Sequence, residues 1–237
     1  MISYHYLFDS KILSIVIYKG NLNMIILIGG EKGGPGKTTL ATNLAAMRTK
    51  ETNDLLLMDT DQQQTASFWC STREDNKVFP RVASIQKLDK AVRSEALALK
   101  EKYKDIIIDA GGRDSAELRG GLLVADKAIF PLRPSQFDLW TFGRINTLVE
   151  TATEINDKLR AYVVLNQAST NPSVKEVEEA KSFILEFPSI KLLNIVISER
   201  IIFRRAAISG MSVTEYRPED PKATEEMRTF YNEVFND

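Results

Sequence analysis

The sequence predicts an α/β fold, a mostly parallel twisted sheet with helices on both faces. From residue 24 onward, short apolar runs rich in β-branched residues alternate with stretches whose apolar residues recur at helical spacing. The runs are nearly continuous in apolar character, which is typical of parallel strands buried on both sides. The chain of 237 residues has no internal repeat and no long linker, so we expect residues 24–237 to form a single domain.

Seven strands are expected in this domain, each an apolar run that ends at polar or small residues. In chain order they are Met24–Ile28, Leu55–Met58, Val82–Ile85, Asp105–Ile108, Ala128–Leu132, Arg160–Leu165 and Leu192–Ile197. A helix is expected over Thr39–Lys50, after the first strand and a short loop. The last helix, Ala223–Phe235, has its aromatic and aliphatic residues on one side, so we expect it to pack on the domain.

Residues 1–23 precede the alternating pattern. Ile12–Tyr18 has the composition of a strand, but the segment lacks the basic region and the small-residue cleavage site of a secretory signal. We expect residues 1–23 to be an extension outside the core, with an added edge strand as the alternative.

Composition excludes several classes of site. The net charge is −1, so binding to nucleic acid would need a local basic patch. Cys70 is the single cysteine and His5 the single histidine, which excludes an internal disulfide, an iron–sulfur cluster within one chain and a multi-histidine metal site. No apolar run approaches the 18 or so residues of a membrane span. A reducing cytoplasm is the expected compartment.

The most informative motif is the glycine-rich stretch EKGGPGKTT at 31–39, directly after the first strand. In such a loop, backbone N–H groups point at phosphate oxygens, Lys37 reaches the outer phosphates and the Thr38 hydroxyl holds Mg²⁺. The positive end of the following helix faces the same anion. ATP and Mg²⁺ are therefore the expected ligands. The expected nucleotide contacts are Lys32, Gly33, Gly34, Gly36, Lys37, Thr38 and Thr39.

Polar residues follow several other strands, and the carboxyl ends of parallel strands meet at one edge of the sheet. Asp59 and Asp61 follow the second strand, Asp109 ends the fourth and Asn166 ends the sixth. An aspartate after an apolar strand, as at Asp109, suits Mg²⁺ held through a water. The alternative is that these residues form turns, with Asp59 and Asp61 capping the next helix.

The form K-G-G-x-G-K-T, with the additional Lys32 and with Glu31 where the general pattern has glycine, resembles the deviant Walker A loop of the ParA/MinD ATPases. The resemblance implies that Lys32 reaches across a dimer interface into the partner's nucleotide and acts in catalysis with Lys37. It also implies that Asp61 positions the attacking water and that Asp59 lies on the Mg²⁺ side, although Gln62 replaces the usual proline of this motif.

Two further roles follow from the same resemblance. Asn166 matches a strand-end asparagine that binds adenine, with simple turn chemistry as the alternative. The run around Arg200, Arg204 and Arg205 resembles the ParA closing segment, whose basic residues bind DNA without reading sequence. Arg200 and Arg204 are expected to share a helix face because they are four residues apart. The alternative is a solvated or ion-paired face.

Together these features predict a small ParA-type partition ATPase without an N-terminal DNA-binding domain. Such a protein would form an ATP-sandwich homodimer, bind DNA non-specifically and hydrolyse ATP when a ParB-like partner stimulates it, in the cytoplasm and on the nucleoid. The alternative is a MinD-like or other cargo-positioning ATPase that acts on a membrane or a protein assembly. The last helix carries Glu225, Glu226 and Glu233 against Arg228, so binding to an anionic membrane is not expected.

Overall fold

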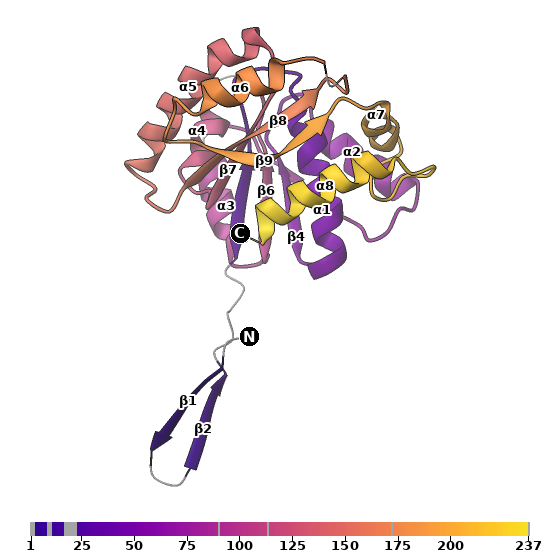
Figure 1. Ribbon diagram of the computed structural model, residues 1–237. Coiled ribbons are helices and arrows are strands. Elements are labelled where there is room, and N and C mark those ends of the chain that lie inside the picture. The colour runs from indigo at the N-terminus through magenta and orange to yellow at the C-terminus, as the bar shows by residue number, and fades with distance from the viewer. Residues whose placement is uncertain are drawn as a thin grey trace.

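The computed structural model describes residues 3–8, 11–16, 23–89, 91–112, 114–171 and 173–236. Its main feature is a parallel sheet of seven strands in the order β5-β4-β6-β3-β7-β8-β9 (Figure 1). The strands are β3 (Met24–Ile28), β4 (Leu55–Asp59), β5 (Ala83–Gln86), β6 (Asp105–Asp109), β7 (Lys127–Leu132), β8 (Arg160–Ala168) and β9 (Lys191–Ser198). The predicted α/β fold is confirmed, and each strand lies where its apolar run predicts it.

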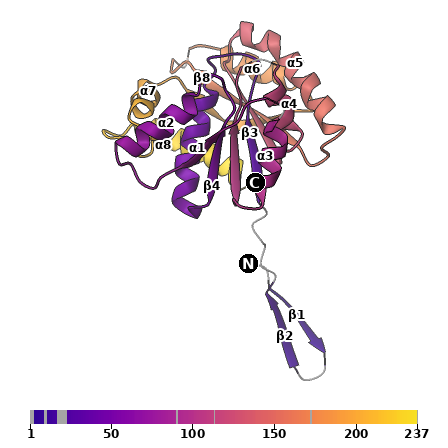
Figure 2. The same cartoon turned by 180° about the vertical axis from the view of Figure 1, so that it is seen from behind.

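Helices cover both faces of the sheet, as Figures 1 and 2 show from opposite sides. One face carries α1 (Lys37–Thr52), α2 (Thr65–Asp75), α7 (Ile201–Ile208) and α8 (Pro221–Phe235). The other face carries α3 (Ala91–Lys100), α4 (Ala116–Leu122), α5 (Gln136–Thr153) and α6 (Glu176–Ile184). Alternate residues of β3 enter opposite cores: Ile25 and Leu27 join one cluster, whereas Ile26 and Ile28 join the other. Burial on both sides therefore explains the unbroken apolar run.

Residues near the chain start form a separate antiparallel pair, β1 (Ser3–Phe8) and β2 (Lys11–Val16). Neither strand joins the seven-stranded sheet, so the alternative of an added edge strand is not observed. The domain boundary expected at residue 24 stays a prediction.

Helix α8 packs on the domain, as predicted. Met227, Phe230 and Val234 are buried against the sheet. On its polar side, the Glu233 carboxylate accepts hydrogen bonds from the backbone N–H groups of Asn194, at 2.8 Å, and Ile195, at 2.9 Å. The acidic residues of α8 therefore cap the open edge of β9, which would otherwise present unpaired backbone donors. Among the described residues, no helix combines the length and the apolar character that crossing a membrane requires.

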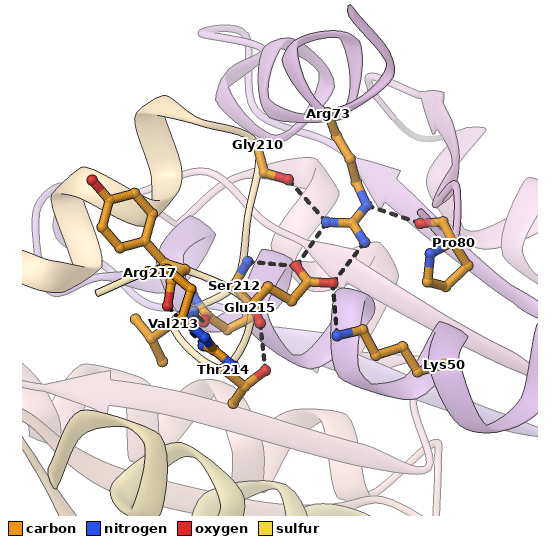
Figure 3. A network of polar contacts seen from close by, with 11 residues as sticks. Lys50, Arg73, Pro80, Gly210, Ser212, Val213, Thr214, Glu215 and Arg217 are labelled. Carbon is orange, nitrogen blue, oxygen red and sulfur yellow. Dashed lines mark hydrogen bonds and ion pairs between the residues drawn. The ribbon is translucent and has the colours of Figure 1, made fainter. Parts of the chain in front are cut away.

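The segment that follows α7 is fastened to α1 and α2 by polar contacts (Figure 3). The Val213 N–H donates to the Asn43 side chain of α1 at 2.8 Å, and both groups are buried. Arg73 of α2 donates to the Gly210 carbonyl at 2.9 Å. The closing segment of the chain thereby stabilises the helix that begins at the glycine-rich loop.

Candidate phosphate-binding site

The glycine-rich loop connects β3 to α1 at the carboxyl edge of the sheet. Register brings the other strand ends to the same level: Asp109 pairs with Ile28 on one side and with Asp59 on the other. Gly36 is the N-cap residue of α1, with φ 92° in the left-handed region. A Cβ atom there would also lie 2.4 Å from the Asn166 amide nitrogen. Only glycine meets both conditions, so the loop geometry depends on this residue.

Lys37 is the first residue of α1 and is buried, with 7% of its surface exposed. Its ammonium donates to the Lys32 carbonyl at 2.7 Å, which holds the side chain along the loop. Burial lowers the pKa of Lys37, and the carboxylates of Asp109 and Asp61 act in the opposite direction. Lys37 therefore interacts electrostatically with both acids that were predicted to act on the attacking water and the metal.

Asp109 is the clearest sign of a cation site. It is 1% exposed, and neither carboxylate oxygen makes a hydrogen bond of normal geometry among the described residues, although the Thr38 hydroxyl interacts with the carboxylate. Its pKa is raised to about 7, chiefly by burial; the carboxylates of Asp59 and Asp61 also act to raise it, whereas the Thr38 hydroxyl and the charge of Lys37 act to lower it. A buried carboxylate without partners is costly unless a ligand compensates it. The carboxylate of Asp109 and the hydroxyl of Thr38 are oxygen donors of the kind that Mg²⁺ prefers, so these two residues fit the predicted metal.

Asp59 uses its carboxylate within the fold. One oxygen accepts hydrogen bonds from the N–H and the hydroxyl of Ser67, both at 2.8 Å, and the other accepts the N–H of Asp61 at 3.1 Å. The carboxylate thus caps the first turn of α2, which is the alternative weighed from the sequence. These bonds favour a structural role for Asp59, and its role beside Mg²⁺ stays a prediction.

Asp61 lies in a polar cavity of about 640 Å³ that Lys32, Gly33, Gly111 and Gly112 also line. Its carboxylate accepts the N–H of Gln63 at 2.9 Å, which fixes the side chain, and the residue is partly exposed. An acid held at the edge of a water-accessible cavity can orient a nucleophilic water. The geometry is compatible with the predicted role of Asp61, which stays a prediction.

The loop after β6 packs directly on the phosphate loop. A Cβ atom at Gly112 would lie 2.7 Å from the backbone nitrogen of Gly33 and 2.8 Å from the carbonyl carbon of Lys32. This contact leaves no space for a side chain at residue 112, which explains the glycine there. A shift of this loop would displace Lys32 and Gly33, so the two loops are mechanically coupled.

Asn166 lies beside the phosphate loop and is 4% exposed. Its amide donates to the Pro35 carbonyl at 2.7 Å. The family resemblance implied an adenine contact for Asn166 and did not predict this partner. Arg133, which was not among the predicted site residues, donates to the Gly34 carbonyl at 3.0 Å and to the side chain of Gln167. Its position directly after β7, level with the other strand ends, is the signal that could have found it.

The predicted DNA-binding arginines are not equivalent, and the expected helix face was wrong for Arg200. Helix α7 begins at Ile201, and Arg200 is its N-cap, with extended backbone at φ −134° and ψ 138°. Its guanidinium forms an ion pair with Glu226 of α8 at 3.0 Å, and that partner raises the pKa of Arg200. Arg204 and Arg205 are exposed on α7, where the structure gives neither an ion pair within the described residues.

The chain is similar in sequence and fold to known nucleotide-binding proteins. The model of the CobQ/CobB/MinD/ParA nucleotide binding domain matches residues 26–213. Maintenance of carboxysome distribution protein A from Halothiobacillus neapolitanus is 26% identical over 218 residues, covering 90% of this chain and 97% of that protein. Apo McdA from Cyanothece has a similar fold, with a TM-score of 0.74 and 15% identity, covering 89% of this chain and 98% of that one.

A second solved structure with this fold is the septum site-determining protein MinD from Pyrococcus horikoshii, complexed with Mg-ADP. It has a TM-score of 0.69 and 20% identity, and the match covers 89% of this chain and 95% of that one. The family model extends from within β3 across the phosphate loop to the segment after α7, which includes the other six strands of the main sheet in full. The chain therefore belongs to the CobQ/CobB/MinD/ParA family of nucleotide-binding P-loop domains.

Proposed function

We propose that this chain is a Mg²⁺-dependent ATPase that dimerises around two nucleotides and uses ATP turnover to position a protein assembly in the cell. The observation that carries the ATPase proposal is the buried Asp109 carboxylate, which makes no hydrogen bond of normal geometry among the described residues and interacts with Lys37 and Thr38. Lys37 would neutralise the outer phosphates, and Asp61 would orient the water that attacks the γ-phosphorus. Cleavage of the bond to the bridging oxygen then releases ADP and inorganic phosphate.

Dimerisation is proposed from the second lysine of the loop. Lys32 lines the open cavity that also contains Asp61, where a second copy could reach the nucleotide. The family resemblance gives this lysine a role in the partner subunit, so ATP should drive association. Light scattering with a non-hydrolysable ATP analogue tests this part, and a monomer at saturating nucleotide would contradict it.

The positioning role is supported by the similarity to McdA, whose full name links it to the distribution of carboxysomes. The match covers 97% of that relative. The cargo of this chain would be a protein assembly, reached through an adaptor that stimulates hydrolysis. Imaging of the fluorescently tagged protein in its host tests the proposal. We expect a moving or graded distribution that collapses to a uniform one in Lys37→Ala, and a wild type that is already uniform would contradict positioning.

A second candidate function is plasmid or chromosome partition through non-specific DNA binding and a ParB-like adaptor. The exposed pair Arg204 and Arg205 on α7 favours it, because phosphate contact requires only accessible positive charge. A cytoplasmic, nucleoid-associated location would follow from such binding. The two functions are compatible, since a positioning ATPase can use DNA as the matrix along which it distributes its cargo.

A further inference from the structure

The carbonyl groups of the phosphate loop are held from outside by side chains of neighbouring strands. For backbone N–H groups of a loop to converge on an anion, the carbonyls of the same peptides must point away and need their own partners. Gly34 and Pro35 are consecutive residues at the apex of the loop. The Gly34 carbonyl accepts from Arg133 at 3.0 Å, and the Pro35 carbonyl accepts from the amide of Asn166 at 2.7 Å.

These two donors lie at the carboxyl ends of the adjacent strands β7 and β8. Arg133 follows β7 and Asn166 lies in β8, next to a register shift between Asn166 and Ala168. Gln167, within that irregularity, adopts a left-handed backbone with φ 56°, and its side chain accepts from the guanidinium of Arg133. The bulge therefore aims Asn166 at the loop while Gln167 secures Arg133.

The contacts have a consequence for the loop apex. Pro35 contributes no N–H, so the bond from Arg133 to the Gly34 carbonyl restrains a peptide that has only a carbonyl to satisfy. The Pro35 carbonyl shares its peptide with the Gly36 N–H, so the bond from Asn166 orients that donor. Gly34 and Gly36 both have left-handed backbones, with φ 98° and 92°, and a loop built on such conformations has few local restraints. Asn166, which is 4% exposed, fills the space beside Gly36 that a side chain there would need. The apex between these glycines is thus restrained mainly by Arg133 and Asn166.

We propose that Arg133 and Asn166 are positioning residues that preform the phosphate-binding loop by holding the carbonyls of Gly34 and Pro35 outward. The inference rests on the proposed binding of ATP. It differs from the role that the family resemblance implied for Asn166, because Asn166 acts here through the phosphate loop rather than by reading the adenine base. Arg133 acts in the same way, through a hydrogen bond to the loop rather than by its charge alone.

The test measures the affinity of full-length protein for a fluorescent ATP analogue, and for tripolyphosphate, which has no base, by competition. Asn166→Asp keeps the size of the side chain but replaces the amide donor with a carboxylate that repels the Pro35 carbonyl. Arg133→Gln keeps a donor without the charge, and Arg133→Lys keeps the charge without the two-point geometry. Arg81→Ala is the matched control, since Arg81 is 72% exposed and pairs with Glu74 at 3.4 Å on the surface.

We expect Asn166→Asp and Arg133→Lys each to weaken the binding of both ligands by about tenfold, from the loss of a hydrogen bond to a charged or buried group. The affinity ratio between the ATP analogue and tripolyphosphate should stay at its wild-type value, because the phosphate site is altered and the base site is not. Arg133→Gln should bind better than Arg133→Lys if hydrogen bonding to Gly34 decides the effect. The thermal unfolding midpoint of the nucleotide-free Arg133 variants should match that of wild type, since the side chain is exposed.

Two results would overturn the inference. If Asn166→Asp weakens the ATP analogue but leaves tripolyphosphate binding unchanged, Asn166 reads the base. If Arg133→Lys binds both ligands as wild type does, Arg133 acts by charge alone. A wild type that binds neither ligand would instead refute the proposed ATPase function, so the two failures are distinguishable.

Discussion

The guanidinium of Arg73 and the carboxylate of Glu215 form a buried two-point ion pair between α2 and the segment that follows α7. The two N–O distances are 2.8 and 2.9 Å, and the side chains are 1% and 7% exposed. Arg73 also donates to the carbonyls of Pro80 and Gly210, both at 2.9 Å (Figure 3). Burial acts to raise the pKa of Glu215, but hydrogen bonds from Arg73, Ser212 and Lys50 hold it below the ordinary value. Glu215 therefore has a structural role: its ion pair with Arg73 holds the segment after α7 against α2.

Removing one partner of this pair should destabilise the fold strongly. Arg73→Ala removes the two-point partner of the buried Glu215 carboxylate, which keeps only Ser212 and Lys50 among the described residues, and removes the donor to the carbonyls of Pro80 and Gly210. We therefore expect a loss of about 3–5 kcal/mol in the free energy of unfolding. Lys50→Ala is the control, because Lys50 is 42% exposed and should contribute less than about 1 kcal/mol. Urea unfolding at pH 7 measures both losses. A loss below about 1 kcal/mol for Arg73→Ala would refute the structural role of the Arg73–Glu215 pair. Because the pKa of Glu215 is lowered by folding, its contribution should be lost as pH falls below about 4.

The protonation state of Asp109 should make the stability of the nucleotide-free protein depend on pH. Folding raises its pKa from the ordinary value of 3.8 to about 7, chiefly because the carboxyl is buried, so its neutral form is favoured in the folded protein. The stability that this provides is fully present below about pH 4 and is lost as pH rises through 7. Asp109→Asn, which stays neutral, should therefore unfold at a higher temperature than wild type at pH 8, when nucleotide and Mg²⁺ are absent. The difference should shrink towards zero near pH 4.

Mg²⁺ and ATP should reverse the order of these two proteins. The ionised carboxylate of Asp109 is then useful, so wild type should gain more thermal stability from Mg–ATP than Asp109→Asn does. Thermal scans at pH 8, with and without Mg–ATP, provide both comparisons. An equal gain in the two proteins would exclude Asp109 from the metal site.

Much of the fold was predictable because a parallel strand that is buried on both faces is a nearly continuous apolar run in the sequence. The strand ends then located Lys37 and Asp109 at one edge of the sheet. The remaining features depend on contacts between residues distant in sequence. Asn166 meets Pro35 across 131 positions, and Arg200 meets Glu226 across 26. No local periodicity encodes which side chain will face a given carbonyl or carboxylate, so these partners required the tertiary structure.

Alanine substitutions of the two lysines in the phosphate loop should have different effects on ATP binding and on dimerisation. Lys37→Ala should abolish ATP binding, because the predicted phosphate site then loses its buried counter-charge. Lys32→Ala should retain measurable ATP binding but lose ATP-dependent dimerisation, if Lys32 acts across the interface. Isothermal titration gives the affinity, and light scattering with a non-hydrolysable analogue gives the oligomeric state. An unimpaired Lys32→Ala dimer would remove the proposed action in trans.

Asp61→Ala should separate ATP binding from hydrolysis. The phosphate loop does not depend on this carboxylate, so affinity for ATP and dimerisation should stay close to wild type. Turnover should fall by about 10²-fold or more, since a positioned base or water-orienting group typically contributes that much. Phosphate release under saturating Mg–ATP is the measurement, with Ser71→Ala, at an exposed position on α2, as the control. Hydrolysis at the wild-type rate would make Asp61 a turn residue.

We expect DNA binding to depend more on Arg204 and Arg205 than on Arg200. Arg204 and Arg205 are exposed on α7, whereas Arg200 is held by Glu226. We expect binding to duplex DNA of any sequence, only with ATP, because dimerisation joins two weak patches. Affinity should fall with salt, with a log–log slope of about −0.9 per neutralised phosphate, and the double variant R204A/R205A should flatten that slope. Arg200→Ala should change it less. Fluorescence anisotropy at several salt concentrations measures the slope, and an unchanged slope in R204A/R205A would place the DNA contact on another surface.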